Sequence, residues 1–424
     1  MERQVMVYVD LNGVPQLVGR LWARARKGRE SATFEYDRSW LAHADRFALE
    51  PALTLGPGPF HTAAGRAMFG AIGDSAPDRW GRVLMRRAER SRATQEGETP
   101  RTVQEMDYLL MVDDGVRQGA LRFSEHEGTP FLAAAEGRAK IPPFLKLARL
   151  LSAAEHVASS TESAEDLRLL LAPGSSLGGA RPKASVRDRD GHLAIAKFPT
   201  ESDTRNVILW EALALTLAHQ AGIAVPVFRV EMVAGKHVLL LRRFDRSGTV
   251  RAPFLSAMSM LDAQDNEPRS YMEFVDVLRQ YGASPKADMH GLWRRIVFNI
   301  LISNTDDHLR NHGFLYQGPE GWRLSPAYDM NPVPVEEKPR VLSTAIDMDD
   351  ATASLELAFA VAGYFELSLM KAKEIAGEVG AVVKRWRAAA GQLGIAGAEV
   401  ERMASAFEHR DLAAAVGTIK PLLG

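Results

Sequence analysis

The chain has 424 residues, of which 46% are hydrophobic and 25% are charged, a composition typical of soluble globular proteins. Its 52 basic and 53 acidic residues nearly cancel, so bulk charge provides no attraction to nucleic acid or to acidic membranes. The sequence contains no cysteine, which excludes disulfides, thiolate nucleophiles and cysteine-bound zinc. The N-terminal residues are charged and no apolar run reaches the ~20 residues of a membrane span, so a cytoplasmic protein without a membrane partner is expected.

The first part of the chain, residues 1–160, is predicted to be a small α+β subdomain. Alternating apolar residues between glycine turns predict an antiparallel meander with strands at residues 5–10, 17–22 and 32–36. Apolar residues at helical spacing then predict helices at residues 79–92, 103–112 and 144–159. A polar link, residues 159–165, is expected to end this subdomain.

The rest of the chain is predicted to form a β-rich nucleotide-binding part, residues 161–246, and a helical catalytic part, residues 247–424. In the β-rich part we expect a Gly/Ser turn, two strands, a helix and two further strands, at residues 173–179, 183–187, 193–198, 206–221, 227–233 and 237–242. In the helical part we expect helices at residues 271–281, 290–303, 355–362, 368–392 and 398–408. A long polar segment interrupts these helices, and such segments usually have a function.

The polar segment begins with SNTDDHLRN at residues 303–311, directly after an apolar helix. Phosphoryl transfer needs an aspartate that orients and deprotonates the attacking hydroxyl, and an asparagine that holds magnesium. Asp306 and Asn311 have the Asp-x4-Asn spacing of protein-kinase catalytic loops. His308 belongs to the same titratable cluster and is a further catalytic candidate. For this pair alone, a polar loop with side-chain caps remains the alternative.

A second acidic candidate is Asp329, in LSPAYDMN at residues 324–331. It lies 18 residues after Asn311, beyond a short predicted hairpin, where a kinase has its second magnesium ligand. Two oxygen donors together with phosphate oxygens suit Mg²⁺, which seldom needs a full protein cage. The sequence therefore predicts that Asn311 and Asp329 bind the metal.

A lysine that contacts the nucleotide phosphates is also needed, together with a carboxylate that holds it. Lys197 ends an apolar strand, where an inward-facing ammonium requires a partner. Glu211, among apolar residues on the following helix, is the natural partner. We therefore predict an ion pair between Lys197 and Glu211.

The stretch GSSLGGARPK, residues 174–183, precedes the strand pair that delivers Lys197. Its small residues Gly178, Gly179 and Ala180 allow backbone N–H groups to approach phosphate, and Lys183 adds a positive charge. It is not a Walker A sequence, because no Gly-Lys-Ser/Thr opens a helix here. Its position predicts a loop that covers the phosphates of ATP.

The run RRFDR, residues 242–246, lies at the junction of the β-rich and helical parts. The backbone at such a hinge is where adenine is read, which makes Arg242 and its neighbours candidates for ATP binding. Asp245 is a candidate acceptor for a ribose hydroxyl. From composition alone, a solvated charge run is an equally good interpretation.

Together these motifs resemble the HipA family, the kinase components of bacterial toxin–antitoxin pairs. GDSAPDRWG at residues 73–81 is also similar to a segment of that family's N-terminal region. The resemblance implies an α+β, two-lobed protein-kinase-like fold that uses ATP and Mg²⁺. It implies Asp306 as the catalytic base, Asn311 and Asp329 as Mg²⁺ ligands, and Lys197 on the nucleotide phosphates.

The resemblance also implies contacts, modification and partners. Phe244 and Asp245 would lie at the adenine and ribose. Autophosphorylation would fall on Ser176, or on its neighbour Ser175, and would withdraw the glycine loop from ATP. The implied partner is a helix-turn-helix antitoxin, so contact with DNA would occur only through the antitoxin complex. The implied activity is protein Ser/Thr phosphorylation, and aminoacyl-tRNA synthetases are among the family's substrates.

Two other functions are compatible with parts of the pattern. A metal-dependent phosphohydrolase would use carboxylates and imidazoles as ligands, namely Asp306, Asp307, His308, His312 and Asp329. It would leave the glycine loop and the predicted Lys197–Glu211 pair without a role. A catalytically silent kinase-like scaffold would lack the base or a metal ligand, yet all of these are present in the sequence.

Overall fold

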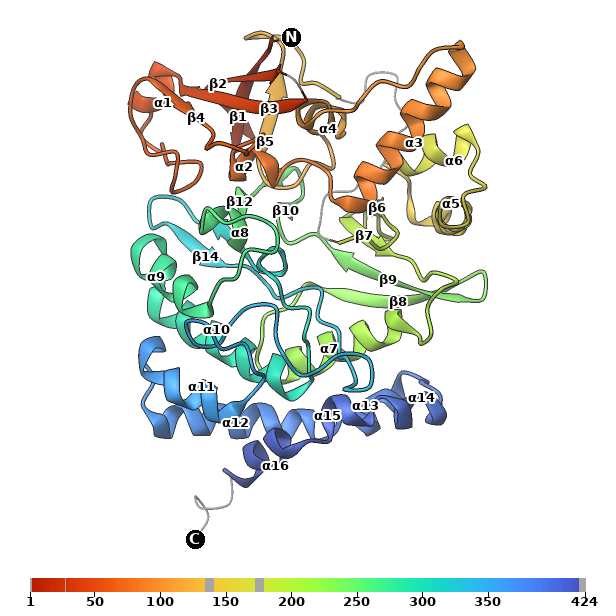
Figure 1. Cartoon of the computed structure of the whole chain (residues 1–424), viewed down its shortest axis with the longest axis vertical. Coiled ribbons are helices and arrows are strands. Elements are labelled where there is room, and N and C mark those ends of the chain that lie inside the picture. The colour runs from red at the N-terminus through yellow and green to blue at the C-terminus, as the bar shows by residue number, and fades with distance from the viewer. Residues whose placement is uncertain (1, 27, 134–140, 172–178, 419–424) are drawn as a thin grey trace. The chain divides into compact units, whose positions relative to one another are not determined.

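The structure, a computed structural model, describes residues 2–26, 28–133, 141–171 and 179–418 (Figure 1). The chain divides into two compact units. The first unit comprises Met1–Ser202 and Glu231–Leu255, and the second comprises Asp203–Val230 and Ser256–Gly424. The predicted parts 1–160 and 161–246 thus lie mostly in the first unit, and the predicted part 247–424 lies mostly in the second.

The N-terminal end of the first unit is a five-stranded antiparallel sheet with the order β4-β3-β2-β1-β5. Its strands are β1 (Glu2–Leu11), β2 (Val14–Arg26), β3 (Arg29–Tyr36), β4 (Pro59–His61) and β5 (Leu121–Ser124). Asn12 and Gly13 connect β1 to β2 with φ angles of 54° and 86°, as a tight hairpin turn requires. The predicted meander is confirmed as β1, β2 and β3, whereas β4 and β5 were not predicted.

A second sheet, in the order β6-β7-β9-β8, carries the predicted nucleotide-binding strands. These strands are β6 (Lys183–Arg187), β7 (Leu193–Lys197), β8 (Phe228–Val233) and β9 (Lys236–Arg242). Ala184, Val186, Ala194 and Ala196 alternate along β6 and β7 and belong to one buried cluster with residues of three helices. The helices are α3 (Arg79–Glu96), α5 (Leu147–Ala158) and α6 (Ala164–Leu171), coloured orange to yellow in Figure 1. They cover one face of the sheet.

Shorter elements complete the first unit. They are α1 (Arg38–Ala42), α2 (Gly70–Gly73), α4 (Glu105–Met111), the 3₁₀ turn η1 (Phe144–Lys146), the hairpin β10 (Arg246–Ser247) and β11 (Val250–Arg251), and β12 (Phe254–Ser256) at the boundary. The expected polar link at residues 159–165 is shorter than predicted, because α6 begins at Ala164. The predicted helices at residues 79–92, 103–112 and 144–159 are confirmed as α3, α4 and η1 with α5.

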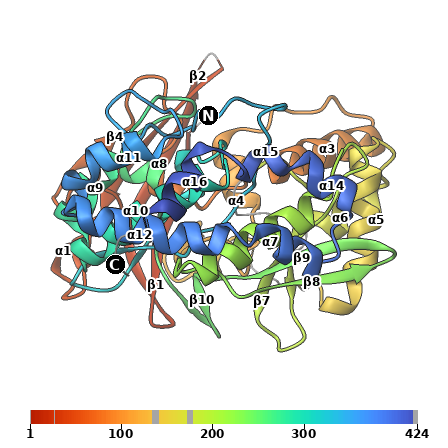
Figure 2. The same ribbon diagram turned by 90° about the horizontal axis from the view of Figure 1, so that it is seen from below.

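The second unit is built on helices. They are α7 (Val207–Gln220), α8 (Ala257–Met260), α9 (Tyr271–Tyr281), α10 (Pro285–Leu301), α11 (Leu355–Val361), α12 (Leu369–Val383), α13 (Trp386–Gln392), α14 (Gly397–Arg402), α15 (Ala404–Phe407) and α16 (Arg410–Gly417), with the 3₁₀ turns η2 (Leu309–Asn311) and η3 (Ala362–Phe365). The hairpin of β13 (Gly313–Tyr316) and β14 (Trp322–Leu324) is the short hairpin that was predicted between Asn311 and Asp329. Helix α10 packs against α9, α11 and α12, and Figure 2 shows α10 beside α12.

Three predicted helices differ from the observed ones. The helix predicted at residues 398–408 is two short helices, α14 and α15, separated by Met403. Helix α10 starts at Pro285 instead of residue 290, since proline is favoured in the first helical turn. The helix predicted at residues 368–392 is two helices, α12 and α13, with Lys384 and Arg385 between them. In the part of the chain that the structure describes, no helix is long and apolar enough to cross a membrane.

Candidate active site

Helix α10 determines where the candidate catalytic loop begins. The helix ends at Leu301, and Ser303 adopts a left-handed φ of 51°. The N–H of Asn304 then donates to the Asn299 carbonyl at 2.9 Å, the bond that closes a Schellman-type helix end. Ser303 is fully buried, and its Oγ accepts a hydrogen bond from Arg340 Nε at 3.1 Å. The buried helix end therefore fixes the direction in which the loop continues from α10.

The two adjacent aspartates of this loop face opposite environments. Asp306 is exposed to solvent, whereas Asp307 is only 3% exposed. The Asp307 carboxylate accepts hydrogen bonds from Asn299 Nδ2 at 2.6 Å, from His312 Nε2 at 3.0 Å and from the Tyr271 hydroxyl. Its backbone carbonyl accepts from Thr344 Oγ1 at 2.7 Å. Asp307 therefore anchors the loop, and Asp306 is the carboxylate of the two that is open to solvent.

The electrostatics of Asp307 agree with this anchoring role. Burial alone would raise the pKa of Asp307, but His312 and the Tyr271 hydroxyl stabilise the carboxylate and bring its pKa below the usual value. Burial and the adjacent charge of Asp307 raise the pKa of Tyr271 well above 10, so Tyr271 stays a hydrogen-bond donor. Asp307 is a permanent buried anion that holds its three donors in place.

Asn311 has the properties expected of a metal ligand. It ends the 3₁₀ turn η2, and its backbone N–H donates to the His308 carbonyl at 2.8 Å. Its Nδ2 donates to the Asp306 carbonyl at 2.9 Å. This bond directs Oδ1 elsewhere, and Oδ1 is buried without a hydrogen-bond partner among the described residues. A buried acceptor without a donor is uncommon, and a bound cation would satisfy it.

The segment that carries Asp329 is tied to the catalytic loop at two points. The N–H of Asn331 donates to Asn304 Oδ1 at 3.2 Å. The Tyr328 hydroxyl donates to the Arg310 carbonyl at 2.8 Å. Asp329 itself is half-buried with a left-handed φ of 58°, a strained conformation of the kind found at functional sites. The second unit thus brings Asp306, His308, Asn311 and the Asp329 segment together.

A hydrolase site is not assembled in the same place. Asp307 and His312 are turned inward and bonded to each other, so neither is presented as a metal ligand. Among the described residues there is no group of three or more His, Cys, Asp or Glu side chains that could hold a metal ion. The donor set that remains is an amide and a carboxylate, which suits Mg²⁺ accompanied by phosphate oxygens.

In the first unit, the end of the glycine loop is held by the N-terminal subdomain. Lys183 Nζ forms an ion pair with Asp78 at 2.8 Å, and both side chains are buried. Asp78 also caps α3 by accepting from the Gly81 N–H at 2.8 Å, and Trp80 Nε1 donates to the Lys183 carbonyl at 3.0 Å. The sequence did not predict this pair, although Asp78 lies in the segment 73–81 that resembles part of the family's N-terminal region.

The other predicted residues of the glycine loop are only partly visible. Gly179 has a φ of 96°, a value that favours glycine. Ala180 follows it and leads to β6. Ser175, Ser176 and Gly178 lie outside the described residues. Their predicted roles therefore stay predictions.

Lys197 ends β7, where it lies directly opposite Lys183 of β6. Two ammonium groups facing each other across a sheet repel, and Asp78 neutralises the one on Lys183. Glu211 is 3% exposed on α7. Because Lys197 and Glu211 belong to different units, their pairing remains a prediction.

The hinge residues have different environments from one another. Phe244 is half-buried, with its ring 6.3 Å from that of Phe254. Asp245 is 1% exposed and accepts from Arg243 Nε at 2.6 Å, Arg246 Nη1 at 2.8 Å and the Gly119 N–H at 2.8 Å. Burial opposes ionisation of Asp245, but the two arginines hold its pKa well below the usual value. The structure supports a structural role for Asp245, and its contact with a ribose stays a prediction.

In one unit, a glycine-rich sequence precedes a sheet in which a lysine ends a strand. The other unit is helical and carries an Asp-x4-Asn loop. These features define the class of kinase-like proteins. Residues 175–386, half of the chain, match the family described as the HipA-like C-terminal domain. The chain therefore belongs to the HipA family.

Solved and curated relatives agree with this assignment. The structure is similar to a chain of the Shewanella oneidensis toxin–antitoxin complex of HipA, HipB and operator DNA, with a TM-score of 0.65 and 15% sequence identity. The match covers 98% of this chain and 96% of the Shewanella chain. This likeness confirms the predicted α+β kinase-like fold. "Putative kinase Y4mE" of Sinorhizobium fredii is 26% identical over 182 residues, which are 37% of this chain and 41% of the relative. A Haemophilus influenzae relative named in the same way is 25% identical over 200 residues, 41% of this chain and 56% of its own length. The chain thus spans about half the length of these curated relatives.

Proposed function

We propose that the protein is an ATP-dependent protein serine/threonine kinase and the toxin of a toxin–antitoxin pair. The observation that carries the proposal is the contrast within one loop. Asp306 is exposed, Asp307 is buried as an anchor, and Asn311 has a buried Oδ1 without a partner among the described residues. A base that substrate can reach, beside an unsatisfied oxygen donor, is what phosphoryl transfer to a hydroxyl requires.

In this mechanism each residue has a defined task. Asp306 accepts a hydrogen bond from a substrate serine or threonine hydroxyl and takes its proton as the oxygen attacks the γ-phosphorus. The bond between the γ-phosphorus and the bridging oxygen breaks, and ADP leaves. Asn311 and Asp329 would hold Mg²⁺, which when bound neutralises charge on the phosphates. Lys197 contacts the phosphates, and Asp307 keeps the loop in position.

The partners follow from family membership and remain part of the proposal. The Shewanella structure was solved with HipB and operator DNA, so we propose a helix-turn-helix antitoxin for this chain, with DNA bound through that complex. Autophosphorylation is proposed at Ser176 or Ser175. A phosphate there would add negative charge next to the triphosphate and weaken ATP binding. An aminoacyl-tRNA synthetase is one candidate protein substrate.

The test is incubation of the full chain with Mg²⁺ and γ-labelled ATP, followed by mapping of the labelled residues. We expect incorporation that falls about 10²–10⁴-fold in Asp306→Asn, the range typical for loss of a general base. Wild-type labelling that persists in Asp306→Asn would exclude Asp306 as the base. If the wild type carries no label on itself or on proteins of a cell extract, while Mg²⁺-ATP binding is retained, the scaffold alternative is favoured.

A further inference from the structure

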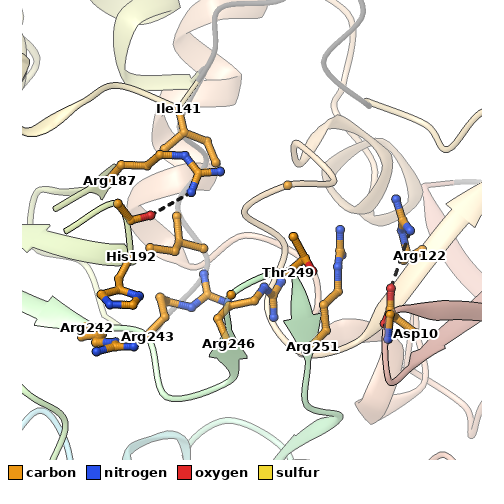
Figure 3. Close-up of a pocket in the computed structure, with 15 residues that line it drawn as sticks. Asp10, Arg122, Ile141, Arg187, His192, Arg242, Arg243, Arg246, Thr249 and Arg251 are labelled. Carbon is orange, nitrogen blue, oxygen red and sulfur yellow. Dashed lines mark hydrogen bonds and ion pairs between the residues drawn. The ribbon is translucent and has the colours of Figure 1, made fainter. Parts of the chain in front are cut away.

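A cavity of about 510 Å³ lies entirely within the first unit (Figure 3). The lining residues come from the end of β1 and the β1–β2 turn, from Gly115 and β5, from Ile141, from the β6–β7 turn with its strand ends, and from the stretch between the end of β9 and β11. Six arginines are among the lining residues, namely Arg122, Arg187, Arg242, Arg243, Arg246 and Arg251. Asp10 is the acidic residue of the lining.

Carboxylates neutralise only part of this positive charge. Asp245 is engaged by Arg243 and Arg246, both of which also donate to backbone carbonyls. Asp114 accepts from Arg122 at 2.6 Å and from Arg251 at 2.9 Å. Among the described residues, the ion pairs of these guanidinium groups involve three carboxylates, Asp10, Asp114 and Asp245, for six arginines, so the cavity wall keeps an excess of positive charge.

Three of the arginines have donors to spare. Arg251 is only 9% exposed, and its Nη1 is buried without a hydrogen-bond partner among the described residues. Arg242 is half-buried, and its guanidinium group forms no hydrogen bond or ion pair with the part of the chain that the structure describes. Among the described residues, the Arg187 guanidinium donates to the Gly191 carbonyl alone, at 3.0 Å. A buried guanidinium nitrogen without a partner is costly in the absence of a bound acceptor.

The arrangement of these groups is elongated. Figure 3 shows Arg187 and Arg242 at one end, Arg122 and Arg251 at the other, and Arg246 between them. Burial is the main reason that the pKa of Arg246 falls to about 9, and nearby cations contribute in the same direction. Burial likewise lowers the pKa of Arg251. An anion in the cavity would relieve this repulsion.

We propose that this cavity binds a small anion that carries two or more phosphate groups. Its volume is that of a small-molecule site and exceeds the space that one phosphate needs. Guanidinium groups match phosphate oxygens in pairs, and the two ends of the cavity offer arginines for separate groups. Apart from His192, the lining residues that the structure describes include no aromatic ring, so recognition would rest on the phosphates and not on a base. The cavity is concave and local, which favours a small ligand over a nucleic-acid backbone.

The experiment is calorimetric titration of the full chain with inorganic tripolyphosphate, pyrophosphate and phosphate, without Mg²⁺. We expect one site for tripolyphosphate, weaker binding of pyrophosphate and the weakest binding of phosphate. Arg187→Gln, at an exposed position, should weaken tripolyphosphate binding about tenfold by removing a charge-assisted contact. Arg189→Gln is the matched control: it removes an arginine of the same turn that pairs with Glu231 outside the cavity, and should leave binding unchanged.

A second variant separates this cavity from the proposed nucleotide site. Lys197→Met should leave tripolyphosphate binding intact. Binding that is lost in Lys197→Met but kept in Arg187→Gln would place the anion at the nucleotide site and overturn the proposal. Equal affinity for phosphate and tripolyphosphate would overturn the requirement for several phosphate groups. The cavity would be a nucleic-acid site if a short DNA duplex bound more tightly than tripolyphosphate and Arg187→Gln weakened DNA binding. That result would overturn the proposal of a small ligand.

Discussion

Replacing the two adjacent aspartates of the catalytic loop one at a time should separate stability from catalysis. Asp307→Asn removes a buried negative charge that accepts three hydrogen bonds, from Tyr271, Asn299 and His312. Hydrogen bonds to a charged group contribute about 1.5–3 kcal/mol each and are not additive. Because asparagine keeps one acceptor oxygen but turns an N–H₂ toward the donors, we expect a loss of about 3 kcal/mol in the free energy of unfolding of the second unit.

The matched variant is Asp306→Asn, whose side chain is exposed. It should change stability by no more than about 0.5 kcal/mol, while abolishing most phosphoryl transfer. Urea-dependent hydrogen exchange of peptides from α9 and α10 reports the stability of the second unit in the full chain. If Asp307→Asn and the wild type unfold at the same urea concentration, or if Asp306→Asn is equally destabilised, the proposed division between anchor and base is wrong.

The effect of Asp307 should also depend on pH in a defined direction. The folded-state pKa of Asp307 is lowered, so its stabilisation is fully present above the unfolded-state pKa and is lost as pH falls through the folded-state value. An unfolded aspartate has a pKa of about 3.9, so the difference in free energy of unfolding between wild type and Asp307→Asn should be constant from about pH 6 to 8 and shrink only below about pH 4. A difference that shrinks near neutral pH would mean that another group titrates.

Three further predictions concern other parts of the molecule. Asn311→Ala should raise the Mg²⁺ concentration for half-maximal kinase activity about tenfold or more, because it removes an oxygen ligand; an unchanged Mg²⁺ titration would count against Asn311 as a ligand. Lys183→Met removes the ammonium that pairs with the buried Asp78 carboxylate and should cost about 3–5 kcal/mol in the free energy of unfolding by urea. Adding Asp78→Asn should cost less than the sum of the two single variants, because asparagine can still cap α3. Gly380→Ala should lower the thermal midpoint, because the new Cβ would lie 2.7 Å from a side chain of α16, whereas Gly391→Ala meets open space and should not.

Periodicity in the sequence predicted most of the regular elements. Helix α9 has the predicted bounds, 271–281, and its start is reinforced by a capping box between Ser270 and Glu273. The break between α12 and α13 was missed, because the apolar spacing continues through it and Lys384 and Arg385 are not helix breakers. Strands β4, β5, β10 and β11 are two to four residues long and were not predicted, because strands of that length show little alternation.

The sequence indicated which residues make up the candidate site, but not which of their side chains are buried and which are exposed. Asp306 and Asp307 are adjacent in an irregular loop, where no periodicity indicates which side chain is buried. Their environments depend on Tyr271 and Asn299, which lie on two preceding helices. Likewise, the partner of Lys183 is Asp78, 105 residues earlier in the chain, and no local pattern links the two.

The run at residues 242–246 illustrates why bulk charge is a poor guide to local function. As a sequence it is one basic segment in a chain whose formal net charge is only -1. In the structure, Arg243 and Asp245 are saturated by each other and by backbone, whereas Arg242 lines a cavity with arginines from β5, β6 and β11. Charges act over a distance of about 8 Å at physiological salt, so compensating acids elsewhere on the chain do not cancel the potential inside that cavity. A nearly neutral protein can therefore contain a strongly cationic site. Its small net charge excludes attraction of a polyanion to the surface as a whole. It does not exclude recognition of a small phosphate ligand in the cavity.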